Sequence, residues 1–206
     1  TAPEALLEAE GVFVQSTNRG AGAPILRGLI GPQNLLLVDG VRFNTAIFRT
    51  GPNQYLSTID PSALLRLEVV RGPSSVLYGE GAMGGVVQAL TCEVPRLGSG
   101  VWGGQTSTWC QSADLALGTA GQLWGRSEKA AWLVGGSVSR FSTLRSAGGT
   151  EQPFSDFESG GWHAKGQWQM GSQWLITGAY LGTRLSNAGR TDQLGRGDLR
   201  FYDNDD

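Results

Sequence analysis

Hydrophobic and polar residues alternate along much of the second half of the chain. In residues 162–170, apolar or small residues at the even positions alternate with His163, Lys165 and two glutamines. A period of two is typical of a β-strand with one apolar and one polar face. Further strands are predicted at about 100–110, 115–125, 130–143 and from residue 174 onward.

The connections between these predicted strands fall into two kinds. Residues 126–129 and 171–173 are short polar turns, whereas residues 144–160 are long and contain glycine and proline. In an antiparallel meander, both short turns lie at one end of the sheet and the long loop at the other. Transmembrane β-barrels show this asymmetry, with short periplasmic turns and longer external loops.

The first half of the chain contains short apolar runs that end at turn residues. Residues 35–38 run into Asp39 and Gly40, which predicts a buried strand bending into a hairpin. Residues 66–71 and 86–89 predict further strands, and residues 25–28 predict a strand that ends in arginine and glycine. The pattern indicates a compact, strand-rich module.

Short helices and loops separate these strands. Thr1 is expected to cap a short helix within residues 2–10, and Asp60 caps a one-turn helix that starts at Pro61. Residues 16–24 are polar and rich in glycine, and residues 43–57 are too polar for a strand and too long for a tight turn, so both are predicted to be exposed loops.

Composition narrows the class of protein. The chain has 206 residues and a net charge of −2, which does not indicate a nucleic-acid-binding surface. The 32 glycines and low charge content suit closely packed strands that meet lipid, and all seven tryptophans lie beyond residue 98. No apolar run is long enough for a transmembrane helix. His163 is the single histidine, and no His and Cys cluster has metal-ligand spacing, so neither a metal nor a cofactor is expected.

A glycine motif at residues 79–84 matches the Gly-x-Gly-x-x-Gly pattern of dinucleotide sites. The β-branched strand that follows lacks the helix N-terminus needed to hold a pyrophosphate, which argues against a nucleotide site. The order of the pieces is more specific: Ile-Leu-Arg-Gly at 25–28, Leu-Val-Asp-Gly-Val-Arg at 37–42, and Glu-Val-Val-Arg-Gly-Pro-Ser-Ser-Val-Leu-Tyr-Gly at 68–79, before a Gly-Gly-Val-Val strand. This order resembles the plug domain of TonB-dependent outer-membrane transporters.

The resemblance implies a mainly β fold, with a globular α+β plug domain (residues 1–97) inside a transmembrane antiparallel β-barrel. Residues 98–206 would supply about five N-terminal strands of that barrel. Five strands cannot enclose a plug, because plugged transporters use 22, so a fragment of a larger receptor is expected, or other outer-membrane chains that complete the wall. The start lacks the basic and apolar regions of a secretory signal, so the chain is expected to begin inside the mature protein.

The function that the resemblance implies is import across the outer membrane of a Gram-negative cell. The ligand would be a scarce nutrient, either a small molecule or a metal chelate: a siderophore, cobalamin, haem or a sugar. The implied partners are outer-membrane lipid, and TonB with its inner-membrane energising complex. The alternative is a plug-containing structural or assembly component that does not transport. No nucleophile and base pair or paired carboxylates stand out, so an enzyme is not expected.

Site residues follow from the resemblance. Arg27 and Arg71 are expected to pair with barrel glutamates and lock the plug in the lumen, with Glu68 orienting Arg71. An ordinary internal salt bridge is the alternative. The loops at 16–24 and 44–55 would form the plug apex and bind the substrate. The expected ligand-binding residues on these loops are Arg19, Asn44, Arg49, Asn53 and Tyr55.

The two cysteines, Cys92 and Cys110, flank the change of pattern between the two halves. In an oxidising compartment a disulfide between them would tie the end of the plug to the first barrel strand. Two unpaired thiols are the alternative.

Overall fold

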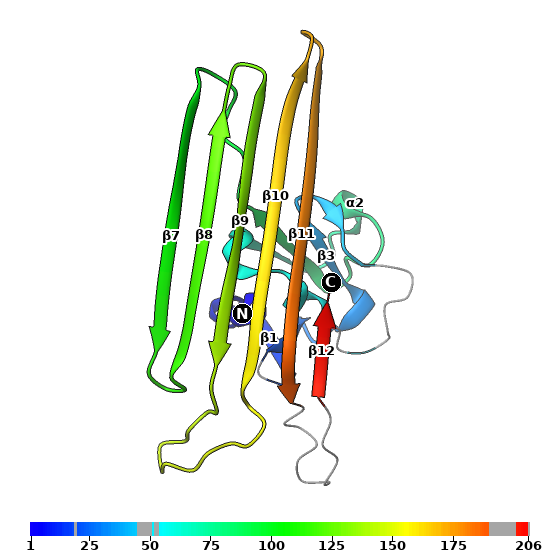
Figure 1. Cartoon of the computed structure of the whole chain (residues 1–206). Coiled ribbons are helices and arrows are strands. Elements are labelled where there is room, and N and C mark those ends of the chain that lie inside the picture. The colour runs from blue at the N-terminus through cyan, green and yellow to red at the C-terminus, as the bar shows by residue number, and fades with distance from the viewer. Residues whose placement is uncertain (19, 45–50, 52–53, 190–200, 206) are drawn as a thin grey trace.

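The computed structural model describes residues 1–18, 20–44, 51, 54–189 and 201–205. Its largest element is a six-stranded antiparallel sheet in which each strand pairs with its neighbours in sequence (Figure 1). The strands are β7 (Val101–Gln111), β8 (Ala116–Arg126), β9 (Ala130–Phe141), β10 (Phe157–Met170), β11 (Trp174–Gly189) and β12 (Phe201–Asp205). The sequence therefore predicted five of these strands, although β10 begins at Phe157, inside the predicted loop at 144–160.

The connections in this sheet have the predicted asymmetry. The short turns after β8 and β10 lie at one end of the sheet, and the long loop between β9 and β10 lies at the other (Figure 1). The turn between β7 and β8 is also short and lies at the end of the long loop. The sheet is thus a meander with the polarity of an outer-membrane barrel wall.

The wall has one apolar and one polar face, as residues 162–170 predicted. Trp162 and Trp168 are 42% and 51% exposed on the face away from the first half of the chain, whereas His163 is buried on the opposite face. Several tryptophan rings each cover the glycine that is paired with that tryptophan on the neighbouring strand. At Gly125, for example, a Cβ would lie 2.7 Å from the indole of Trp132. The glycines therefore leave room for large rings in a thin sheet.

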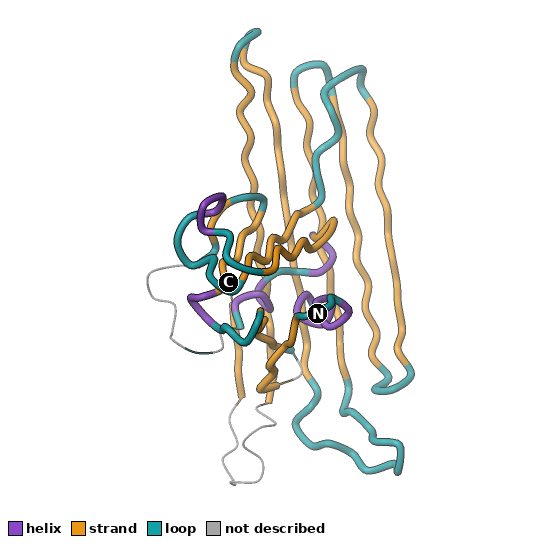
Figure 2. The backbone as a smooth tube through the Cα atoms, turned by 180° about the vertical axis from the view of Figure 1, so that it is seen from behind, coloured by secondary structure: helices purple, strands orange, loops and turns teal. Residues whose placement is uncertain are grey.

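The first half forms a small α+β domain, the plug, that packs on the polar face of the wall (Figure 2). One of its sheets is a hairpin of β1 and β2, and the other has the order β4-β3-β6-β5, with β3 and β6 parallel. Its elements are α1 (Ala2–Ala5), η1 (Leu6–Glu8), β1 (Val12–Asn18), β2 (Ala21–Leu26), η2 (Gly31–Gln33), β3 (Asn34–Val38), β4 (Val41–Arg42), η3 (Tyr55–Thr58), η4 (Pro61–Ala63), β5 (Leu64–Arg71), α2 (Ser75–Tyr78) and β6 (Gly85–Thr91).

The core of the plug lies between the two sheets and the N-terminal helix. Leu26, Leu36, Leu56 and Val87 are buried together there, with Leu6 from the first helical turns. None of the helices in the described part of the chain is long and apolar enough to cross a membrane.

The predicted exposed loop at residues 16–24 is wrong. Most of this segment belongs to β1 and β2, and residues 21–24 are buried. The small side chains that suggested a loop instead allow close packing, because a Cβ at Gly22 would lie 2.7 Å from Val14 Cγ1 and 2.8 Å from Pro3 Cβ. Composition indicated an exposed loop where the fold has a buried strand.

Candidate functional site

The plug contacts the wall through two carboxylates. The first belongs to Asp39, in the turn between β3 and β4, where the backbone has a φ of 49°. Its Oδ2 lies 2.8 Å from Nζ of Lys165 on β10. The side chain of Lys165 is 13% exposed and that of Asp39 31%, so this ion pair is largely shielded from water.

Thr91, the last residue of β6, also binds Asp39. The Thr91 backbone N–H donates to Oδ1 at 2.8 Å, and its hydroxyl donates to Oδ2 at 2.7 Å. Partial burial on its own would raise the pKa of Asp39, but the hydrogen bonds from Lys165 and Thr91 outweigh burial and hold the pKa below its ordinary value. Asp39 therefore joins the hairpin turn, the end of β6 and the wall as a carboxylate.

The second carboxylate belongs to Asp60, which caps η4 and contacts the wall at β9 and β10. Its Oδ1 accepts from the backbone N–H of Ser62 at 3.0 Å and from the hydroxyl of Ser137 on β9 at 2.9 Å. Opposite it on β10 stands Gly161, where a Cβ would overlap the carboxyl group. A third contact is near: the Thr183 hydroxyl on β11 donates to the Thr58 carbonyl at 2.7 Å.

His163 lies between Gly161 and Lys165 on the same face of β10. It is 6% exposed, and its ring covers Gly135, with which it is paired on β9. Among the described residues neither ring nitrogen has a hydrogen-bond partner. The single histidine is thus part of the plug–wall interface. The described part of the chain has no group of three His, Cys, Asp or Glu residues that could hold a metal.

Of the two predicted locking arginines, Arg71 makes a polar contact inside the plug. Nη1 of Arg71 donates to the Glu10 carbonyl at 2.6 Å. Glu68 does not orient Arg71: three residues apart on one strand, the two point to opposite faces, and Glu68 instead binds Nε of Arg66 at 2.7 Å. Arg27 is exposed, with its guanidinium beside Gly72. Locking by Arg27 and Arg71 through barrel glutamates stays a prediction.

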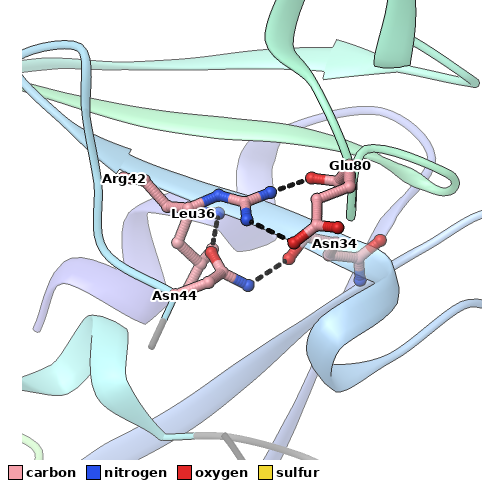
Figure 3. A network of polar contacts seen from close by, with 5 residues as sticks. All are labelled: Asn34, Leu36, Arg42, Asn44 and Glu80. Carbon is pink, nitrogen blue, oxygen red and sulfur yellow. Dashed lines mark hydrogen bonds and ion pairs between the residues drawn. The ribbon is translucent and has the colours of Figure 1, made fainter. Parts of the chain in front are cut away.

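Of the predicted substrate-binding residues, Arg19, Arg49 and Asn53 lie outside the described residues. The side-chain amide of Asn44 is hydrogen-bonded to the backbone of β3. It accepts from the Leu36 N–H at 2.6 Å and donates to the Asn34 carbonyl at 2.9 Å, which closes the edge of β3 beyond β4 (Figure 3). Tyr55 meets Phe43 edge to face, with ring centroids 6.5 Å apart.

A surface ion pair lies beside this network. Nη1 of Arg42 lies 3.1 Å from Oε1 of Glu80, and Nη2 donates to the Glu80 carbonyl (Figure 3). The Glu80 side chain is 91% exposed, so this pair adds little stability. Asn34 is 1% exposed and donates to the carbonyls of Leu29 and Pro24, which fixes the start of β3 against β2.

Two of the cavities that the described residues form between the plug and the wall differ in their lining. The first, of about 500 Å³, lies between β11 and the β3–β4 turn with η3, and Phe43, Tyr55, Ile59 and Leu181 line it together with Asp39. The second, of about 260 Å³, is lined by Asp60, by hydroxyl groups of both domains and by several apolar side chains. The first is therefore largely apolar, and the second is the more polar of the two.

Of the two alternatives for Cys92 and Cys110, the structure has the unpaired one: both cysteines are free thiols. Cys92 lies near Lys165 and interacts electrostatically with it. Across the sheet, Lys165 is paired through β9 and β8 with the position of Gly103 on β7. Cys110 stands seven residues farther along β7, about 23 Å away, and on the opposite face. The two thiols cannot approach the distance that a disulfide needs.

Sequence reasoning did not identify Asp39, Asp60 and Lys165 as the residues that join the two domains. The available signal was the charge of Lys165 on the polar face of an otherwise uncharged strand, because a buried cation needs a carboxylate partner. Asp39 and Asp60 were interpreted as turn and cap residues, which they also are.

Comparison with known proteins agrees with this arrangement. Residues 1–86 match the family model of the TonB-dependent receptor plug domain. A hemin receptor of Yersinia pestis is 30% identical over 159 residues, which are 74% of this chain and 22% of the relative. The vitamin B12 transporter BtuB of Vibrio vulnificus (strain YJ016) is 41% identical over 71 residues, 34% of this chain and 11% of the relative. The chain thus spans about a fifth of the length of the hemin receptor.

Solved structures share the fold. The copper transporter OprC superposes with a TM-score of 0.75 at 20% identity, covering 90% of this chain and 28% of OprC. A double mutant of the Serratia marcescens hemophore receptor HasR, in complex with its hemophore HasA and heme, also gives 0.75, at 18% identity, and covers 90% of this chain and 29% of HasR. At these identities the likeness supports the arrangement of plug and wall only.

Proposed function

Because the chain belongs to the TonB-dependent receptors, a family of outer-membrane transport receptors with a plugged β-barrel, we propose that it imports a scarce extracellular nutrient. In this proposal residues 1–97 are the plug and residues 98–206 are the first part of the barrel wall. The structure is consistent with that division, since β6 ends at Thr91 and β7 begins at Val101.

The observation that carries the proposal is the docking of the plug on the polar face of the wall. Asp39 binds Lys165 and Asp60 binds Ser137, so the plug is held by a few polar contacts with cavities between them. Water can replace polar contacts of this kind when the plug moves. A plug that must open a path for a ligand needs an interface that can separate in this way.

The proposed ligand is haem, cobalamin, a siderophore or a sugar, and haem is tested first because a hemin receptor matches most of this chain. The proposed energy source is TonB with its inner-membrane complex, as in the family. We propose no enzymatic activity.

Growth under nutrient limitation tests the proposal. The complete gene product that carries this chain is expressed in a Gram-negative host without its own receptors, and hemin, cyanocobalamin, a ferric siderophore or a maltooligosaccharide is the limiting nutrient. We expect growth on one of the four, and no growth in a matched host that lacks TonB. A receptor that reaches the outer membrane but supports growth on none of them, or supports growth equally without TonB, contradicts the proposal.

A further inference from the structure

The 500 Å³ cavity between plug and wall has the size and lining of a small-molecule site. Ligand pockets usually measure about 300–1,000 Å³ and are mainly apolar, with few polar groups. Phe43, Tyr55 and Ile59 form the plug side, and Ala179 and Leu181 of β11 form the wall side. Both domains are needed to build this cavity.

The one charged group in the lining is already neutralised. Both oxygens of Asp39 are bound, by Lys165 and by the amide and hydroxyl of Thr91. The carboxylate therefore offers little attraction to a cationic ligand, and the aromatic and aliphatic groups dominate the remaining surface. Phe43 and Tyr55 are packed edge to face, which presents two fixed rings without the entropy of a flexible side chain.

The cavity also adjoins the two ends of the segment expected to meet the substrate. Phe43 directly precedes Asn44, which is fixed to β3, and Tyr55, the last residue of that segment, begins η3. The two rings in the cavity are therefore neighbours in sequence of the predicted ligand-binding residues.

We infer that this cavity is an internal binding site for the uncharged, apolar ring portion of the imported ligand. The inference rests on the proposed function and deepens it. Charged groups of the ligand stay outside the cavity, because no unpaired charge in its described lining would compensate their loss of water. The cavity beside Asp60 serves as the comparison, since it lies between the same two domains and has more polar groups in its lining.

Cysteine labelling of the complete receptor in intact outer membranes tests the inference. Both native thiols are removed by C92A and C110S, and the reporter is either L181C in the apolar cavity or S159C in the polar one. The reagents are an uncharged pyrene maleimide and a dianionic stilbene maleimide. We expect the ratio of uncharged to anionic labelling rates to be at least tenfold higher for L181C. A179W, which fills the apolar cavity, should slow the labelling of L181C.

Competition links the cavity to the ligand. The nutrient identified by the growth assay should protect L181C from the uncharged reagent at least fivefold. Equal rate ratios at the two positions, or no protection by a nutrient that the receptor imports, would overturn the inference. Failure of the proposed function is seen separately, as absence of growth on every nutrient, because the labelling ratio does not depend on transport.

Discussion

The ion pair between Asp39 and Lys165 provides the sharpest quantitative test of how the plug is held. Two unit charges 2.8 Å apart attract by about 6 kcal/mol at an effective dielectric constant of about 20. Loss of hydration offsets most of this, and a hydrogen bond between charged groups contributes a net of about 2 kcal/mol. K165M should therefore lower the ratio of docked to undocked plug about 30-fold.

Removing the carboxylate should cost more than removing the amine. In K165M, Asp39 keeps both hydrogen bonds from Thr91. In D39N, Lys165 stays 13% exposed without an anion, a loss of about 3 kcal/mol. The double variant D39N/K165M should resemble K165M, which gives a coupling energy of about 3 kcal/mol between the two residues.

Hydrogen exchange of the complete receptor, read by mass spectrometry on peptides that cover β6, measures these changes. The matched control is R66M, which breaks the exposed ion pair of Arg66 with Glu68 inside the plug and should change exchange less than threefold. If K165M exchanges no faster than R66M, the ion pair does not hold the plug and the reasoning fails.

Acid should remove the stabilisation that the ion pair of Asp39 and Lys165 gives to plug docking. The pKa of Asp39 is lowered in the folded protein, so its stabilisation is fully present above its ordinary value of 3.8 and is lost as pH falls through the lowered pKa. The difference between wild type and K165M should therefore be constant from pH 5 to pH 7 and shrink below about pH 4. A difference that persists undiminished at pH 2 would show that charge is not its source.

Three further predictions test the interface, the plug and the outer face of the wall. G161A places a methyl group on the Asp60 carboxyl and should weaken docking by about 1–3 kcal/mol in the same exchange assay, whereas G178A, which meets nothing within 4 Å, should be nearly neutral. N44A leaves the Leu36 N–H without its acceptor, so urea unfolding of the plug should show a loss of about 1–2 kcal/mol. In intact membranes Cys110 should react faster with a lipid-soluble maleimide than with a charged one, because it faces away from the plug; the reverse preference would contradict its position.

The sequence was most informative where a local rule decides the structure. The period of two in residues 162–170 predicted both the strand and its two faces, since a strand places alternate side chains on opposite sides. The Asp60 cap and the Asp39 turn also follow from local backbone chemistry, and the structure has both.

Contacts between distant segments were less predictable. The pairing of Asp39 with Lys165 depends on the plug meeting β10 in one register, and nothing near either residue encodes that register. The buried strand at residues 21–24 was mistaken for a loop because small residues are compatible with both, and only packing against Pro3 and Val14 decides. The sequence left open whether Cys92 and Cys110 form a disulfide, because nearness in sequence does not show which face of β7 Cys110 occupies.

A zero-length cross-link between Asp39 and Lys165 would test most directly whether the plug sits on the wall as described. A carbodiimide joins a carboxylate to an amine only when they touch, and Lys165 and Lys129 are the two lysines of the chain. In outer membranes that contain the complete receptor, we expect a linked peptide pair that joins Asp39 to Lys165 and is lost in K165M. Linkage of Lys165 to a different carboxylate, with none to Asp39, would contradict the docked arrangement.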